Sequence, residues 1–339
     1  MSLPTTKFHA PLLLMGRIST LAACILVGAS SHFIASAAPL TPGEPILLPG
    51  TKGRFDFIRI DPVHQRLLLG HGGNNSFDVF DIPTSRLLKS FSGCDSSDAA
   101  VDTRRGKYFA SCSKPARVVI VDAVSLEITG EVPLPADPDL ISCDPSTGLV
   151  HVCNDKAPEQ WVVDPTAKKI VSTITFQGGG MEDMAFSPDG KFLYQALKGS
   201  SAVAVVDLAS NAVSSTWSCM PEKGPWGLSV APEVNGLLAA CAGKLLLFDC
   251  ATGKVTSSAP IEPRVDEMAY DQDLHIAYTS SRLGFLSATS VGAGKLTPLG
   301  DVPTIKGCAD VTVDAKTHLV WIAYPKEDQV FVQSFAPAK

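Results

Sequence analysis

Acidic residues recur at one place in a repeated pattern along this chain. They lie four or five residues ahead of the point at which an apolar stretch ends, usually at an Asp. Six of the seven repeats carry an acid there: Asp56, Asp98, Asp139, Glu182 with Asp183, Asp266 with Glu267, and Asp310. The remaining repeat has Pro225-Trp226 instead. Carboxylate oxygens are the ligands that divalent cations such as Ca²⁺ prefer, so the pattern predicts a site for a divalent cation or a cationic ligand.

Two interpretations of these acids stay open. If they surround one opening, their mutual repulsion must be relieved by water, by protonation or by a bound cation. The candidate metal ligands are then Asp56, Asp98, Asp139, Asp266 and Asp310. Alternatively, each acid accepts hydrogen bonds from backbone N–H groups of its own loop and has a purely structural role.

Other side chains near the acids extend the candidate binding site. His71, in GHGGNN, could be a ligand or a general base, or it could make a hydrogen bond within its loop. Trp226 could stack on a flat ligand or pack as a lid. Arg54, Arg264 and Lys306 could orient a carboxylate or neutralise the acids.

The elements that position these residues are repeated units of about 42 residues. The first signal, an apolar strand that ends in a turn, recurs every 40 to 44 residues, at Asp61, Asp102, Asp144, Ser187, Ala231, Asp271 and Asp314. A second signal, an apolar run followed by Asp and a polar strand, comes 18 to 20 residues later, at Asp81, Asp122, Asp164, Asp207 and Asp249. Asp suits such turns because its side chain hydrogen-bonds the backbone two residues on.

Each unit has room for four β-strands, and four strands in 40 to 45 residues are typical of a propeller blade. Seven units therefore predict an all-β, seven-bladed β-propeller, formed as a single monomeric domain by residues 44–336. The last unit is one strand short. We expect residues 44–48 to pair beside the C-terminal strands and to close the ring. In a closed ring the acids lie around one mouth of the channel.

Composition and missing motifs argue against several classes of function. The formal net charge is −6 and the basic residues are scattered, which disfavours a nucleic-acid partner. The sequence has no GxSxG or HExxH motif, no P-loop, no dinucleotide fingerprint and no paired CxxC. Covalent hydrolase and redox-cofactor functions therefore lose most of their support.

The cysteines indicate disulfide bonds. Cys94 and Cys219 each precede an inner strand, and Cys112 and Cys241 each lie near the end of the following strand. This repeated placement favours the pairs Cys94–Cys112 and Cys219–Cys241. If Cys94 and Cys308 were instead free thiols, they could form a soft-metal site with His71.

The N-terminus is typical of an exported protein. Lys7 and Arg17 precede an apolar run over residues 18–29, and Ala35-Ser36-Ala37 resembles a signal-peptidase site. We therefore expect a signal peptide over residues 1–37, cleaved near Ala37, and a periplasmic or secreted protein with no transmembrane segment in the mature chain. An uncleaved anchor is disfavoured because the apolar run is short of the roughly 20 residues that span a membrane. Leu21-Ala22-Ala23-Cys24 also fits a lipoprotein cleavage box.

Several segments resemble the YncE-like, YVTN-repeat family of exported bacterial propellers. They are SPDGKFLY (187–194), FDFIRIDPVHQRLLLGHG (55–72), PDLISCDPSTGLVHVCN (138–154) and VDEMAYD (265–271). The resemblance implies the seven-bladed fold but no assigned chemistry. The chain departs from the family at Ser97-Asp98, where relatives often carry His-Gly, so a ligand role for a histidine at that place is not implied.

These observations lead to one hypothesis and two alternatives. The leading hypothesis is an exported binding protein that recognises a small molecule, a cation or a protein at the acidic channel face, without catalysis. The first alternative is a metal-dependent hydrolase, lactonase or lyase, in which the acids hold a divalent cation and His71 is the acid or base. The second is a scaffolding role through the blade edges.

Overall fold

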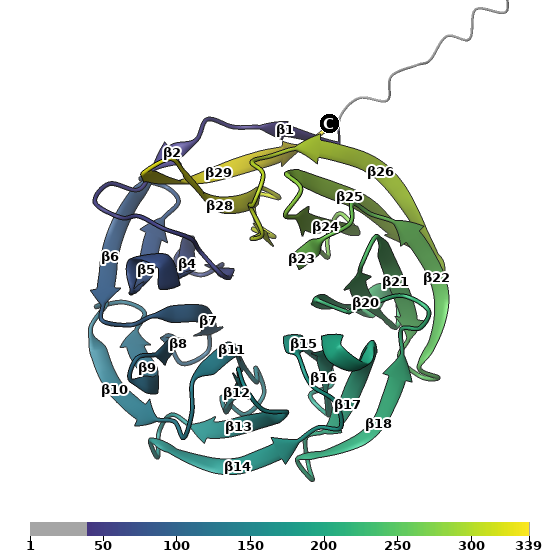
Figure 1. Cartoon of the computed structure of the whole chain (residues 1–339), viewed down its shortest axis with the longest axis horizontal. Helices are drawn as coiled ribbons and strands as arrows, with labels where there is room; N and C mark the ends of the chain where they lie inside the picture. Colours follow the sequence, from purple (N-terminus) through teal and green to yellow (C-terminus); the bar gives the residue numbers. More distant parts are fainter. Residues whose placement is uncertain (1–38, 339) are drawn as a thin grey trace, which may run out of the picture. The chain divides into compact units, whose positions relative to one another are not determined.

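The computed structural model describes residues 39–338, which form seven antiparallel β-sheets around a central channel (Figure 1). The predicted signal peptide, its cleavage site and the lipoprotein box lie outside the described residues. Within residues 39–338, no helix has the length and apolar character needed to cross a membrane. The predicted all-β, seven-bladed propeller is confirmed.

Each of the first six blades is a meander of four strands that runs from the channel to the rim (Figure 1). Blade 1 comprises β3 (Ile58–Asp61), β4 (Arg66–His71), β5 (Ser76–Asp81) and β6 (Arg86–Ser92). Blade 2 comprises β7 (Ser96–Asp102), β8 (Lys107–Ser113), β9 (Ala116–Asp122) and β10 (Ile128–Pro133). Blade 3 comprises β11 (Pro138–Cys143), β12 (Val150–Asn154), β13 (Glu159–Asp164) and β14 (Lys169–Thr175).

The next three blades repeat this order. Blade 4 comprises β15 (Met181–Phe186), β16 (Phe192–Leu197), β17 (Ala202–Asp207) and β18 (Ala212–Ser218). Blade 5 comprises β19 (Gly227–Ala231), β20 (Gly236–Cys241), β21 (Lys244–Asp249) and β22 (Lys254–Pro260). Blade 6 comprises β23 (Val265–Asp271), β24 (Ile276–Ser281), β25 (Phe285–Gly292) and β26 (Lys295–Pro303). Three short 3₁₀ turns lie between strands: η1 (Gly72–Asn74), η2 (Lys198–Ser200) and η3 (Pro232–Val234).

Blade 7 closes the ring with strands from both ends of the chain. It comprises β27 (Thr312–Val313), β28 (Val320–Lys326), β29 (Gln329–Pro337), β1 (Leu40–Pro42) and β2 (Ile46–Leu47). The predicted pairing of residues 44–48 is confirmed, because β2 pairs with β29. The strand β1 adds a second antiparallel pairing to β29, ahead of the predicted boundary at residue 44. Leu40 and Leu48 are buried there, so closure also adds apolar packing.

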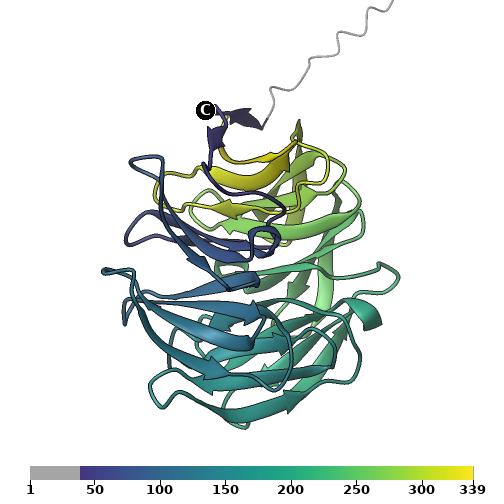
Figure 2. The same cartoon turned by 60° about the vertical axis from the view of Figure 1, so that its left-hand side comes forward.

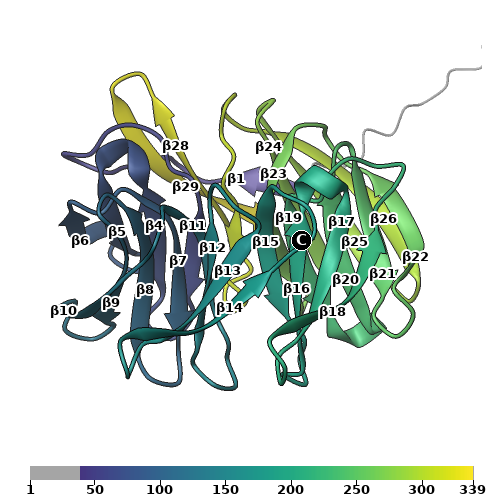
Figure 3. The ribbon, with the colours of Figure 1, turned by 60° about the horizontal axis from the view of Figure 1, so that its bottom comes forward.

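The core of the described propeller is divided among the junctions between blades. Seven apolar clusters are present, and each joins side chains of two neighbouring blades. Seen from the side, the strands run between two faces of the ring, with loops on both faces (Figures 2 and 3). The seven inner strands run in the same direction because every blade repeats the same meander. The residues that precede them therefore lie on one face, and the turns that follow them lie on the other.

One of the two predicted disulfides is present. Cys94 and Cys112 are joined in blade 2. The prediction for Cys219 and Cys241 is wrong for this structure, in which both are buried free cysteines. Their thiols nevertheless lie close enough together in blade 5 for Cys219 to raise the pKa of Cys241. The repeat brings the two sulfurs together as expected, but a bond also requires a specific Cβ geometry and an oxidation step, which position in a repeat does not provide.

Candidate functional site

The acids that precede the inner strands form two tiers. Adjacent residues at the start of a strand point in different directions, so the fourth and fifth positions before the turn cannot both face the mouth. The fifth position supplies four partly exposed carboxylates, the outer tier: Asp56, Asp139, Glu182 and Asp266. The fourth position supplies four buried carboxylates, the deep tier: Asp98, Asp183, Glu267 and Asp310.

Three outer-tier carboxylates are paired with a cation. Arg54 donates to Asp56 at 2.8 Å, and both side chains lie in the loop before β3. Lys198 of η2 contacts Glu182, and Arg282 contacts Asp266. The three cationic side chains are between 38% and 64% exposed, so each can move away from its partner without being pulled out of a packed core.

Asp139 is the exception in the outer tier. No Lys, Arg or His among residues 39–338 forms a salt bridge with it. Burial, together with the charges of Asp56 and Glu182, raises the pKa of Asp139 to about 7. Burial also raises the pKa of Glu182 to about 7, against the opposing effect of Lys198. At neutral pH the mouth therefore carries an uncompensated and partly ionised carboxyl.

The Asp139→Asn variant should be more stable than the wild type at pH 8. A carboxyl whose pKa is raised on folding destabilises the native state where it is ionised, so this cost is present above pH 7 and disappears as the pH falls towards 4. We expect a gain of about 1–4 kcal/mol at pH 8 and almost none at pH 4. Urea unfolding at both pH values measures it. An equal gain at both would mean that the charge of Asp139 is not responsible.

The deep tier is organised around one arginine. Arg59 of β3 donates to both oxygens of Asp98, at 2.9 Å each, and reaches Asp183 at 3.4 Å. Burial by itself would lower the pKa of Arg59, but the carboxylates of Asp98 and Asp183 together have the larger effect and raise this pKa above its ordinary value. The guanidinium is therefore always charged. The side chain also lies over the ring of Phe57, at 5.1 Å from the centroid. Arg59 thus neutralises carboxylates from blades 2 and 4 inside the channel.

Arg59 was missed in the sequence, although a signal for it exists. It stands two residues before the first turn of its blade, where every other blade has a small residue that lines the channel: Ala100, Ser142, Ala185, Ser229, Ala269 and Thr312. Because these six side chains are small, the channel has room for the long side chain of Arg59. Comparing this position across the repeats would have identified Arg59.

Three deep-tier carboxylates also connect neighbouring blades. Asp98 accepts a hydrogen bond from the backbone N–H of Ile141, and Asp183 accepts one from Leu228, both at 3.2 Å. Glu267 accepts one from Val311 at 2.8 Å. Blades 2, 4 and 6 are thereby joined to blades 3, 5 and 7. The structural interpretation of the acids is therefore correct for these residues. Asp98 and Asp183 also accept a hydrogen bond from the next residue of their own strand, Ala99 N–H at 2.8 Å and Met184 N–H at 3.0 Å, so they join the two blades.

Asp310, the last member of the deep tier, lies close enough to Glu267 for its charge to affect that carboxyl. One carboxylate oxygen of Asp310 and one of Glu267 are buried without a hydrogen-bond partner in the described structure. Burial raises the pKa of both groups, and the charge of Asp310 raises that of Glu267 further. The pair therefore retains a proton at a pH at which a surface carboxyl is ionised, and that proton relieves the repulsion.

His71 lies inside blade 1 rather than at the open mouth. Its ring is fully buried, stacked on Phe55 with 4.0 Å between centroids, and its Nδ1 lies 2.7 Å from Asp78. Ser90 donates to the other oxygen of that carboxylate at 2.5 Å. These contacts correspond to the structural interpretation of His71. The soft-metal site with His71 required free thiols at both Cys94 and Cys308, and this condition is not met because Cys94 is bonded to Cys112.

The remaining candidates occupy the rim. Trp226 is half-buried and packs on the apolar cluster between blades 5 and 6, as a lid would. Arg264 and Lys306 are exposed. The partner of Asp266 is Arg282, which the sequence did not indicate.

No group of three or more His, Cys, Asp or Glu side chains within residues 39–338 is close enough together to hold a metal ion. The two tiers spread the acids around the channel instead of gathering them at one point. The metal ligands and the metal-dependent activity remain predictions from the sequence.

Comparisons with known proteins support the fold. No protein-family model and no curated protein sequence matches the chain. Among solved structures, a chain of Kuenenia stuttgartiensis hydrazine synthase is similar, with 17% identity and a TM-score of 0.70 over 84% of this chain and 95% of that one. U3-55K is similar with 11% identity and a TM-score of 0.74, over 89% and 99% of the two chains. At these identities the likeness shows that the chain shares a β-propeller fold with these proteins.

Proposed function

We propose that this protein is an exported, non-enzymatic binding propeller that recognises a cationic group of a small molecule or protein at its outer tier. The ligand class is an organic ammonium or guanidinium group. The observation that carries the proposal is Asp139, a carboxyl without a salt-bridge partner in the described residues, beside partly ionised Glu182.

An organic cation fits this mouth better than a metal ion. Three of the four outer carboxylates already have a flexible cationic partner, so about one negative charge is left to be neutralised. A monovalent group supplies that charge and can donate several hydrogen bonds to carboxylate oxygens. Binding would also remove the electrostatic cost of Asp139, which supports a ligand at this position.

Calorimetric titration tests the proposal. The probes are lysine methyl ester, arginine methyl ester and spermidine, with calcium, magnesium and zinc chlorides for comparison. We expect at least one organic cation to bind at pH 8 and Asp139→Asn to weaken that binding about tenfold to a hundredfold, the value of a charge-assisted hydrogen bond. Binding should weaken as the pH falls through about 7, because Asp139 and Glu182 become neutral.

Asp301→Asn is the matched control, because it removes the same charge from an exposed position in β26, outside the mouth. It should leave the affinity unchanged. The proposal fails if none of the organic cations binds, or if their binding survives Asp139→Asn. Binding of divalent ions alone, lost in Asp139→Asn, would favour the metal-dependent alternative instead.

The proposed location is the periplasm or the exterior, as for the YncE-like, YVTN-repeat propellers that the sequence resembles. Support comes from the signal-peptide pattern over residues 1–37 and from the Cys94–Cys112 disulfide, a bond that persists mainly in oxidising compartments. N-terminal sequencing of protein from fractionated cells should find a chain that starts near Ala38. An intact Met1 on protein from the cytosol would contradict export.

A further inference from the structure

The face opposite the acidic mouth carries the first turn of each blade, and most of these turns are joined to a neighbour by a side-chain hydrogen bond. Written as donor to acceptor, these bonds run from Tyr108 to Asp61, Arg104 to Pro145, Arg105 to Thr147, Tyr270 to Glu233 and Gln65 to Asp314. His318 also contacts Asp271. These contacts bridge five of the seven junctions between blades.

Blade 4 is different. Within the described residues, no side-chain hydrogen bond joins its first turn, 187–190, to either neighbouring blade. The grooves on its two sides remain as cavities of about 340 Å³ towards blade 3 and about 380 Å³ towards blade 5, and Phe192 lines both. Ligand pockets in proteins usually begin at about 300 Å³, so the larger cavity has the size of a small-molecule site.

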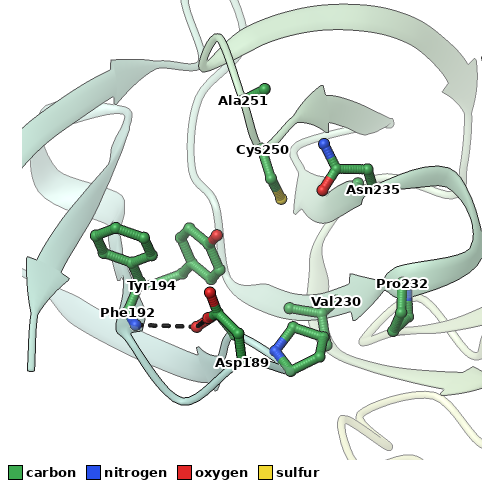
Figure 4. Close-up of a pocket in the computed structure, with 11 residues that line it drawn as sticks. Asp189, Phe192, Tyr194, Val230, Pro232, Asn235, Cys250 and Ala251 are labelled. Carbon is green, nitrogen blue, oxygen red and sulfur yellow. Dashed lines mark hydrogen bonds between the residues drawn. The ribbon is translucent and has the colours of Figure 1, made fainter.

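The walls of the larger cavity suit a ring. Pro188, Phe192, Val230 and Pro232 supply flat or apolar surfaces from the two blades. At one end the hydroxyl of Tyr194 and the thiol of Cys250 lie close enough for each to shift the pKa of the other. Figure 4 shows these two groups and the amide of Asn235 around one open space.

The cavity offers no net charge to a ligand. Burial raises the pKa of both Tyr194 and Cys250, so both are neutral at physiological pH. The carboxylate of Asp189 at the rim is already paired with Lys191 at 3.1 Å. A charged ligand would therefore lose its hydration without gaining a counter-charge.

We propose that the cavity between blades 4 and 5 binds a small, uncharged aromatic molecule with one hydroxyl group, with the ring between Pro188, Phe192 and Val230 and the hydroxyl at Tyr194 and Cys250. The site is separate from the acidic mouth and does not depend on the function proposed there.

The test uses 4-fluorophenol as the probe and its ¹⁹F resonance as the readout. Cys250 gives a second readout, because it is the one partly exposed member of the free cysteines among residues 39–338, and bound phenol should slow its alkylation by iodoacetamide. Ala251→Trp covers the cavity from an exposed lining position and should weaken binding by about tenfold or more.

Ala209→Trp is the matched control. Ala209 occupies the equivalent position in the turn of blade 4 and lines the smaller cavity, so this variant should bind 4-fluorophenol as the wild type does. Fluorobenzene, which lacks the hydroxyl, should bind more weakly, and so should charged 4-fluorobenzoate. The proposal is overturned if 4-fluorophenol does not bind, if the two tryptophan variants behave alike, or if either comparison compound binds more tightly.

Discussion

Replacing Arg59 with glutamine should lower the free energy of unfolding by about 3–5 kcal/mol, the cost of leaving buried charges without a partner. Arg59 is the salt-bridge partner of Asp98 and Asp183 in the channel, and its charge also acts on Glu267. Glutamine retains much of the side-chain volume but none of the charge. Urea unfolding at pH 7.5 measures the loss.

The pH dependence of this loss identifies its cause. Burial has already raised the pKa values of Asp183 and Glu267. As the pH falls towards 5 these groups take up protons, the repulsion is relieved, and the gap between variant and wild type should narrow. Adding Asp98→Asn to Arg59→Gln should also restore part of the stability, because it removes one of the buried negative charges.

Arg86→Gln is the matched control, because Arg86 belongs to the same blade and is exposed. It should change stability by no more than about 0.5 kcal/mol. If Arg59→Gln behaves like Arg86→Gln, or if its deficit grows as the pH falls, the deep tier is not held together by the arginine charge.

Removing the disulfide of blade 2 should have the second largest effect. Cys94 and Cys112 are 18 residues apart, and a bond that closes a loop of this length contributes about 3 kcal/mol by restricting the unfolded chain. The double variant Cys94→Ala, Cys112→Ala should therefore be less stable than the wild type under non-reducing conditions. Thermal or urea unfolding checks this.

Blade 5 supplies the matched control for the disulfide. Cys219→Ala, Cys241→Ala removes two buried sulfurs from the corresponding positions, but in the structure these are thiols. The difference between the two double variants then isolates the bond from the lost packing, and we expect it to be about 2–4 kcal/mol. Dithiothreitol should abolish this difference. Equal losses without reductant, together with resistance of Cys219 and Cys241 to alkylation in urea, would show that blade 5 is also disulfide-bonded.

Comparison of the repeats predicted the position of the acids but not their division into tiers. Asp266 and Glu267 are adjacent, and both satisfied the pattern of an acid shortly before an inner strand. In the structure Asp266 is partly exposed and paired with Arg282, whereas Glu267 is buried and accepts a bond from the next blade. The pattern accepted an acid at either of two adjacent positions. In a β-strand that is not precise enough, because adjacent side chains point to opposite sides.

His71 shows a different limit of the sequence. A histidine in a glycine-rich loop near the mouth has the right chemistry for a ligand or a base. Whether it can serve depends on Phe55 and Asp78, which bury and hold it. Those contacts depend on the packing of blade 1, which a list of residue types does not contain.

The sequence by itself determined the number of blades and the strand that closes the ring. These features follow from local turn chemistry and from a repeat period, and both can be read along the chain. Only the tertiary structure decided which carboxyls are neutralised. Arg59 meets Asp98 and Asp183 across 39 and 124 residues of chain, and Asp139 is left without such a partner. Charge compensation depends on distance in space, and closure of the ring sets those distances.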